Sequence, residues 1–279
     1  MIRFEYTDSQ FDIKDTNESD LSILTGMDSF VFAIADSHGS IMQLKEYQLS
    51  LKLHSLQELT DAIQSIFNRE SILSSGFRKV SYAISNKSFV FVPSKFFVRK
   101  EAANYLAHAM NLNSEQEIGV SEVEDLHSQM VFALPEILHQ QIRTFQPNSN
   151  LVHSSIGLFN AYQKNKAVNS SNYFGLHFRG PIQFVSLIQD GFLRFHNAFK
   201  IESAKDALYY LLLAAEQMHM SPAESNVLLS GEIRMDSEVV KLVKRYFQSV
   251  GNFSGNIPDD LKEKIPFHNY VDVLGALTL

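Results

Sequence analysis

Two short segments combine a histidine with residue types that could do chemistry. Asp36-Ser-His38 has the acid-x-histidine spacing with which two-metal phosphoesterases begin, but the Gly-Asp and Gly-Asn-His sequences that complete such a site do not occur. His153-Ser-Ser155 could supply a base and a nucleophile, yet there is no Gly-x-Ser-x-Gly sequence and no acid that can be named as the third member. We therefore interpret the first segment as a hairpin turn with an exposed histidine. The second is interpreted as a strand end followed by serines that cap a helix.

A third pair could bind an anion. His177 and Arg179 alternate along the chain, so in a strand they share one face. If that face lined a cleft, the two side chains could hold a phosphate or a carboxylate. The more common alternative for such a pair is exposure to solvent, or an ion pair with a neighbour such as Asp190.

The composition excludes several classes of site and partner. The chain has 279 residues, 45% of them hydrophobic, and no cysteine, so disulfides, thiolate zinc sites and cysteine nucleophiles are excluded. The net charge of −7 disfavours binding to a nucleic-acid backbone. The longest apolar runs, Phe30–Ala35 and Leu208–Ala215, are too short to span a bilayer, and we expect a cytoplasmic protein that does not insert into a membrane.

The elements that must position these residues begin with a hairpin. The acidic stretch Asp8–Asp28 is expected to be irregular, and Phe30–Asp36 and Ser40–Leu49 are predicted strands around a turn that contains Gly39. Ser55 and Glu58 have the spacing of a capping box and predict a helix that continues to Phe67. Further strands are predicted at Lys79–Ser85, Lys87–Val92, Gly119–Leu126 and Gln129–Leu134, with helices at 99–110 and up to Phe145.

The second half repeats this order. After a boundary at Gln146–Asn150, we predict a strand Leu151–His153, a helix to Tyr162 and a polar connection Lys164–Asn172. Three strands are predicted next: Tyr173–Phe178, Ile182–Ile188 and Phe192–Ile201. A helix Ser203–Met218, a strand Asn226–Ser230 and a helix from Asp236 to Gln248 complete the prediction. The helix Ser203–Met218 is expected to bury Leu211 and Leu212. Hairpin, helix and strand thus occur twice, which predicts two α/β lobes, 1–150 and 151–279, facing each other across a cleft.

Two such hairpin-first lobes in tandem resemble the superfamily of actin and the sugar kinases, whose lobes are ribonuclease H-like. Short stretches also resemble a bacterial family of unknown function with the actin-like ATPase fold, and more distantly the actin-like proteins of pilus assembly and type II secretion. These stretches are Phe91-Val-Pro93 with Phe96 and Phe97, Tyr105-Leu106, Phe132-Ala-Leu-Pro135, Pro266-Phe-His-Asn-Tyr270 and Leu274. The resemblance implies an α/β protein with an actin-like ATPase fold.

The resemblance also implies where a nucleotide would bind, and the first such position is altered here. In the superfamily, the first hairpin turn carries Asp-x-Gly followed by Ser or Thr, and its N–H groups hold phosphate. Here the sequence is Asp36-Ser-His-Gly39-Ser40, so the glycine comes one residue late.

The other two positions depart further. The second hairpin turn, which carries another Asp-x-Gly in the superfamily, reads Arg179-Gly180-Pro181, without an acid and with a proline that has no N–H. The third position, a Gly-Gly pair beside the adenosine, reads Gly231-Glu232. Together the three departures argue against hydrolysis of Mg-ATP, since the metal loses ligands and the phosphates lose donors.

Three functions remain open from the sequence. The favoured one is a non-catalytic actin-like scaffold or protein-binding module that needs no cofactor. Its partner would be another protein, and a second copy of the chain is a further candidate partner. The first alternative is a protein that holds ATP or ADP with little turnover. The second is a ribonuclease H-like nuclease, which would need converging carboxylates for two metal ions, and only Asp36 is available.

Overall fold

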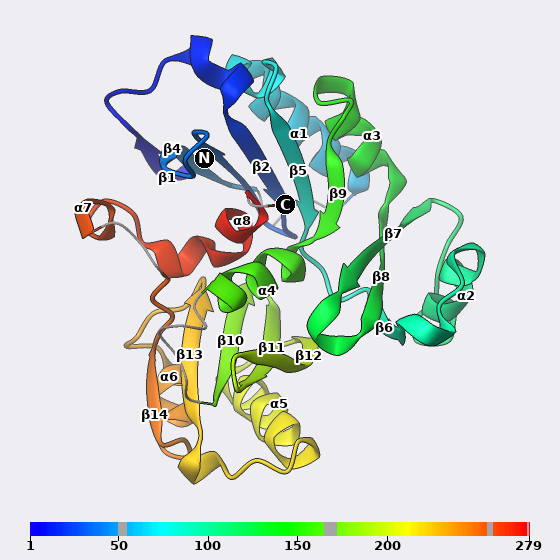
Figure 1. Cartoon of the computed structure of the whole chain (residues 1–279), viewed down its shortest axis with the longest axis vertical. Coiled ribbons are helices and arrows are strands. Elements are labelled where there is room, and N and C mark those ends of the chain that lie inside the picture. The colour runs from blue at the N-terminus through cyan, green and yellow to red at the C-terminus, as the bar shows by residue number, and fades with distance from the viewer. Residues whose placement is uncertain (50–54, 165–171, 256–258, 278) are drawn as a thin grey trace. The chain divides into compact units, whose positions relative to one another are not determined.

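The computed structural model describes residues 1–49, 55–164, 172–255, 259–277 and 279. The chain forms two compact α/β units, which Figure 1 shows with their elements labelled. The first contains Met1–Val123, His127–Gly157 and Val273–Leu279, and the second contains Glu124–Leu126 and Leu158–Asp272. The domain boundary predicted after residue 150 stays a prediction. The predicted polar connection falls largely on residues 165–171, outside the described residues.

A six-stranded sheet in the order β1-β4-β3-β2-β5-β9 forms the centre of the first unit. Its strands are β1 (Ile2–Thr7), β2 (Asp20–Thr25), β3 (Ser29–Ala35), β4 (Ile41–Gln48), β5 (Lys79–Ile84) and β9 (Asn150–His153). β1, β4, β3 and β2 pair antiparallel, and β5 is parallel to β2 and to β9. The expectation that Asp8–Asp28 is irregular is therefore wrong for β2, every residue of which is buried. β9, predicted to open the second half, is an edge strand of this sheet.

Two helices of the first unit pack on one another. They are α1 (Leu56–Arg69) and α3 (Glu136–Phe145), and the short 3-10 helices η1 (Ile13–Glu18) and η2 (Ser71–Ser74) precede β2 and β5. The hydroxyl of Ser55 accepts a hydrogen bond from the Glu58 N–H, as the capping spacing predicts. The Phe67 ring of α1 stacks on Phe145 of α3, with ring centroids 4.2 Å apart, and meets Phe30 of β3 edge-on at 5.9 Å.

A separate three-stranded antiparallel sheet, in the order β6-β8-β7, completes the first unit. Its strands are β6 (Phe89–Pro93), β7 (Gln116–Val123) and β8 (Ser128–Pro135), and α2 (Ala102–Ala107) packs on it next to the 3-10 turns η3 (Ser94–Phe96) and η4 (Arg99–Glu101). Another 3-10 turn, η5 (Glu124–Leu126), connects β7 to β8 and is assigned to the second unit. The turn between β5 and β6 therefore joins two different sheets and does not close a hairpin, because β6 pairs with β8.

The second unit is built on a five-stranded sheet in the order β12-β11-β10-β13-β14. The strands are β10 (Tyr173–Arg179), β11 (Ile182–Gln189), β12 (Phe192–Lys200), β13 (Asn226–Gly231) and β14 (Ser249–Asn252). The first three pair antiparallel, and β13 is parallel to both β10 and β14. α5 (Ala204–Gln217) and α6 (Glu238–Val243) pack into the hydrophobic core of this sheet. Ser237, and not Asp236, caps α6, which ends at Val243 instead of Gln248.

The remaining helices are short or connect the two units. They are α4 (Ser154–Lys164), η6 (Pro222–Glu224), α7 (Asp259–Lys262), η7 (Phe267–Tyr270) and α8 (Val271–Ala276). α4 and α8 each contain residues of both units. In the described part of the chain, no helix has both the length and the apolar character needed to cross a bilayer.

The two large sheets share one connection order. In the first unit, β2, β3 and β4 are antiparallel, α1 follows, and β5 returns parallel to β2. In the second, β10, β11 and β12 are antiparallel, α5 follows, and β13 returns parallel to β10. The turn between β10 and β11 therefore corresponds to the β2–β3 turn. The repeat predicted from the sequence pairs the β10–β11 turn with the β3–β4 turn instead. The reason is that the residues of β2 are expected there to be irregular.

Candidate functional site

The β3–β4 turn holds Asp36, Gly39 and Ser40 and closes on its own backbone. The Asp36 Oδ1 accepts hydrogen bonds from the N–H groups of His38 at 2.9 Å and Ser40 at 2.8 Å. The N–H of Gly39, whose φ is +84°, donates to the Asp36 carbonyl at 3.0 Å. Three N–H groups that could have faced a phosphate are thus used within the turn.

The place of this turn in the sheet also differs from the expected one. Asp20 at the start of β2 lies opposite Ala35, the last residue of β3, and beside Lys79, the first residue of β5. The turn after Ala35 is therefore at the amino ends of the parallel strands. In open α/β sheets, ligands bind at the carboxyl ends. Asp36, Gly39 and Ser40 therefore lie at the amino ends of these strands, opposite to the carboxyl ends where a ligand is expected.

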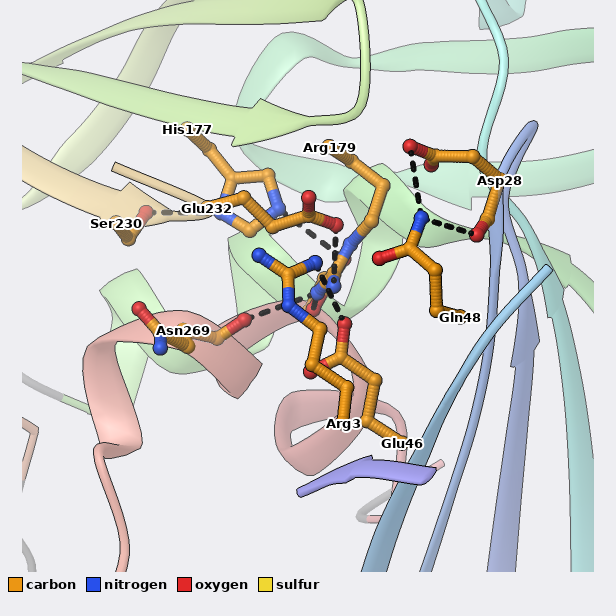
Figure 2. A network of polar contacts seen from close by, with 10 residues as sticks. Arg3, Asp28, Glu46, Gln48, His177, Arg179, Ser230, Glu232 and Asn269 are labelled. Carbon is orange, nitrogen blue, oxygen red and sulfur yellow. Dashed lines mark hydrogen bonds and ion pairs between the residues drawn. The ribbon is translucent and has the colours of Figure 1, made fainter. Parts of the chain in front are cut away.

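The turn at the carboxyl end of β2 contains Gly26, Met27 and Asp28. Its N–H groups are also engaged in part, since that of Gly26 donates to the Ser29 carbonyl at 2.8 Å. Asp28 accepts from the side chain of Gln48, whose Nε2 lies 3.1 Å from the Asp28 carbonyl and 3.5 Å from its carboxylate (Figure 2). The acid and the glycine are present, but in the reverse of the Asp-x-Gly order.

In the second unit, the β10–β11 turn begins at a buried arginine. Arg179 is 1% exposed, and its guanidinium makes two hydrogen bonds to the carboxylate of Asp272, with Nε–Oδ2 3.1 Å and Nη2–Oδ1 2.6 Å. Nη2 also donates to the Asn269 carbonyl at 3.0 Å, and Nη1 lies 3.4 Å from Oε1 of Glu232 (Figure 2). Gly180, with φ +54°, and Pro181 complete the two-residue turn. The guanidinium is therefore engaged by two carboxylates and a backbone carbonyl of the described residues.

His177 joins the same network from the same face of β10. Its Nδ1 is 2.9 Å from the Ser230 hydroxyl and its Nε2 is 3.1 Å from Oδ2 of Asp272. All three side chains are 1% exposed or less. Burial alone would raise the pKa of the Asp272 carboxyl, but Arg179 and His177 outweigh it and hold that pKa well below its ordinary value. The Ser–His–Asp order resembles a catalytic triad, yet its serine is closed to substrate.

Gly231 and Glu232 end β13 next to this network. Gly231 has φ +79°, and a Cβ at this position would lie 1.9 Å from the Phe178 carbonyl oxygen. The Glu232 N–H donates to that same oxygen at 2.8 Å. Glycine is therefore required for the close approach of β13 to β10. Glu232 directs its carboxylate to Arg179.

The structure thus brings together four of the predicted site residues, Arg179, Gly180, Gly231 and Glu232, and places the other three, Asp36, Gly39 and Ser40, in a turn of the first unit. His177 and Arg179 share a face, as their alternation predicts, but their partner is Asp272 and not Asp190. Sequence reasoning missed Asp272. A single acid within the apolar run Val271–Leu277 was the signal that could have found it, because such an acid is buried only when it is paired.

The other histidine candidate is also a core residue. His153 is fully buried, its Nδ1 accepts from the Ser155 N–H at 3.2 Å, and its Nε2 is 3.0 Å from the Asn86 carbonyl. A carbonyl only accepts, so Nε2 carries the proton and the ring is neutral. Burial lowers the pKa of His153 to about 4. Among the described residues, no cluster of three acids or histidines could hold a metal ion.

Comparisons with known proteins agree with this architecture. A family model described as "Protein of unknown function (DUF3822)" matches residues 8–250. No curated protein matches. A solved structure from Bacteroides thetaiotaomicron, a protein with an actin-like ATPase fold and unknown function, is similar with a TM-score of 0.82 at 18% identity, over 97% of this chain and 100% of that one. A chain of the PilM–PilN type IV pilus biogenesis complex is similar with a TM-score of 0.61 at 11% identity, over 93% and 97% of the two chains. The predicted fold and family resemblance are confirmed.

Proposed function

This chain belongs to the DUF3822 family, whose function is unknown, and it has an actin-like ATPase fold; we propose that it is a non-catalytic actin-like protein that binds another protein. It takes no nucleotide as a cofactor. The turns that hold Mg-ATP in the superfamily it resembles have become structural parts of its two units.

The engaged guanidinium of Arg179 is the observation that carries this proposal. Arg179 stands where the second hairpin turn of the superfamily begins, and a cation there could have bound phosphate. Its donors instead meet Asp272, Glu232 and the Asn269 carbonyl, within 2.6 to 3.4 Å. A bidentate arginine–carboxylate pair is among the strongest charge-assisted contacts in proteins, so a phosphate would have to displace it. The adjoining Pro181 has no N–H to offer.

A protein is the partner that the remaining observations favour. The acidic chain, with a net charge of −7, repels nucleic acid. PilM, a protein of the same fold, forms a complex with a second protein, PilN. A fold that has given up its nucleotide can still present two rigid units to such a partner.

Calorimetric titration of the purified chain with Mg-ATP tests the loss of nucleotide binding. We expect no heat of binding that corresponds to a Kd below about 1 mM, and no release of phosphate above the buffer rate. The same titration of Arg179→Met, which removes the cation from the turn, should give the same flat result. A micromolar Kd for the wild-type chain would overturn the proposal and favour a nucleotide-binding protein.

A further inference from the structure

An exposed basic surface lies beside the small sheet of the first unit. We define it by five exposed residues of η3, η4 and the short link between them: Lys95, Phe96, Val98, Arg99 and Lys100. Phe96 is 63% exposed and Val98 45%. None of its three cations has an ion pair within the described residues. Exposed apolar side chains that lie next to unpaired cations are a candidate docking surface.

The basic surface is held in one shape by α2. The Tyr105 hydroxyl donates to the Phe96 carbonyl at 2.9 Å and accepts from the Val98 N–H at 3.1 Å. The Phe97 ring lies 5.9 Å from the Tyr105 ring, and the Lys95 ammonium is 4.8 Å from the centre of the Phe96 ring. Because the backbone is fixed before binding, little conformational entropy is lost when a partner docks.

The same unit carries an exposed acidic surface whose charge is opposite to that of the basic surface. We define it by Asp12, Ile13, Asp15 and Glu18 on and next to η1, all of them exposed, with Ile13 50% exposed. Its three carboxylates make no ion pairs within the described residues, and Lys14 is the cation among them. The Asp12 carboxylate caps η1 by accepting from the Lys14 N–H at 3.0 Å, which fixes this segment too. The acidic surface thus has three carboxylates and an exposed aliphatic residue, and the basic surface has three cations and an exposed aromatic residue, so their charges are complementary.

From this complementarity we infer that the chain associates with a second copy of itself, through the basic surface of one molecule and the acidic surface of the next. The two surfaces lie at opposite ends of the first unit (Figure 1), so an interface between them is head-to-tail and leaves one free surface at each end. The inference adds a second copy of the chain as a partner of the protein-binding module proposed above, and it rests on that proposal. Its failure would leave the loss of nucleotide binding untouched, since that is measured separately by the titration with Mg-ATP.

Sedimentation velocity of the wild-type chain gives the first test. At about 20 mM salt we expect the weight-average mass to rise above the monomer mass of 31.7 kDa as the concentration rises to about 100 µM. At about 0.5 M salt, where the Debye length falls to a few Å, it should return to the monomer. A chain that stays monomeric at low salt overturns the inference.

Charge reversal on each surface gives the sharper test. Lys95→Glu with Arg99→Glu and Lys100→Glu reverses the basic surface, and Asp15→Lys with Glu18→Lys reverses the acidic one without removing the Asp12 cap. Each variant alone should self-associate at least about tenfold more weakly than wild type, because like charges then face each other. An equimolar mixture should recover association, since each reversed surface finds an opposite charge on the other variant.

The matched control reverses three exposed cations elsewhere, Lys241→Glu with Lys244→Glu and Arg245→Glu on and after α6. It changes the net charge as much as the basic-surface variant and should associate like wild type. If it weakens association equally, or if the two surface variants fail to recover together, head-to-tail pairing is wrong. Unchanged thermal melts would exclude misfolding as the cause in either case.

Discussion

At the scale of single residues, the second unit contains a buried network of charged and polar side chains beside the β10–β11 turn. Arg179 and His177 both contact one buried carboxylate, that of Asp272. Taking charges out of water costs several kcal/mol per ion, and only close pairing with further hydrogen bonds offsets this. Ser230, Asn269 and Glu232 supply those bonds.

Removal of Asp272 should destabilise the fold, because the buried network then loses the carboxylate that its side chains share. Asp272→Ala removes the carboxylate that holds the buried guanidinium of Arg179 by two hydrogen bonds, and we expect a loss of about 3–5 kcal/mol in the free energy of unfolding. Urea denaturation measures it. Asp236→Ala, which breaks an exposed pair with Arg234, is the control and should be indistinguishable from wild type. An Asp272→Ala chain as stable as wild type would show that the network does not stabilise the fold.

The contacts of individual residues were also the feature that the sequence predicted least well. The alternation of His177 and Arg179 correctly predicted a shared face, because side chains alternate along a strand. Their partner lies more than ninety residues away in the chain, at Asp272, and no local spacing encodes such a contact. Gly231 was interpreted as a remnant of a nucleotide site, whereas the nearby Phe178 carbonyl is what requires it.

At the scale of elements, the strongly apolar segments were predicted well and the mixed ones were not. β3, β10, β11 and α5 lie where their hydrophobic patterns place them. β2 was missed because Asp20, Ser22 and Thr25 interrupt its apolar residues, yet small hydroxyls can be buried in the middle of a sheet, and Ser22 and Thr25 are fully buried. β6 was predicted as a strand, but its pairing could not be predicted locally, since its partner β8 begins only after α2 and β7.

The helix α5 offers a quantitative check of its predicted face. Leu211 is fully buried in the core of the second unit, and Leu212, expected to be equally buried, is only partly so. Leu211→Ala should cost about 2–5 kcal/mol in the free energy of unfolding, and Leu212→Ala clearly less. Tyr209→Ala, on the same helix and 60% exposed, should stay within about 0.5 kcal/mol of wild type. Equal losses for the two leucines in urea would show that the face is wrongly assigned.

At the scale of the whole molecule, the order of elements proved more informative than any motif. Antiparallel strands, a helix and a parallel return strand occur in both units, and this repeat predicted the actin-like ATPase fold that the solved relatives confirm. The turn that corresponds to a superfamily site depends on which strands pair. Because β2 was not predicted, the first candidate site was placed at the β3–β4 turn instead of the β2–β3 turn. A fold is specified by many weak preferences, whereas a site needs every residue in place.

Stability of the whole chain should depend on pH through His153. Burial lowers its folded-state pKa to about 4, from the ordinary value of 6.5. Between these values the unfolded chain binds a proton that the folded chain does not, so the stability that the neutral ring contributes is complete above pH 6.5 and is lost as the pH falls towards 4. One residue shifted this far is worth on the order of 3 kcal/mol across the window. The depressed pKa of Asp272 acts in the same direction but only below its ordinary value of 3.8, so the two groups act in separate ranges.

Free energies of unfolding at about pH 7.5 and pH 5 isolate the histidine. His153→Gln keeps a donor for the Asn86 carbonyl and an acceptor for the Ser155 N–H but cannot titrate. We expect the wild-type chain to lose about 2 kcal/mol more than this variant between the two pH values. His38→Gln, at an exposed turn, should follow wild type throughout. Identical losses in the wild-type and His153→Gln chains would mean that the buried ring accepts a proton without cost. The neutral tautomer inferred from its contacts with Ser155 and Asn86 would then be wrong.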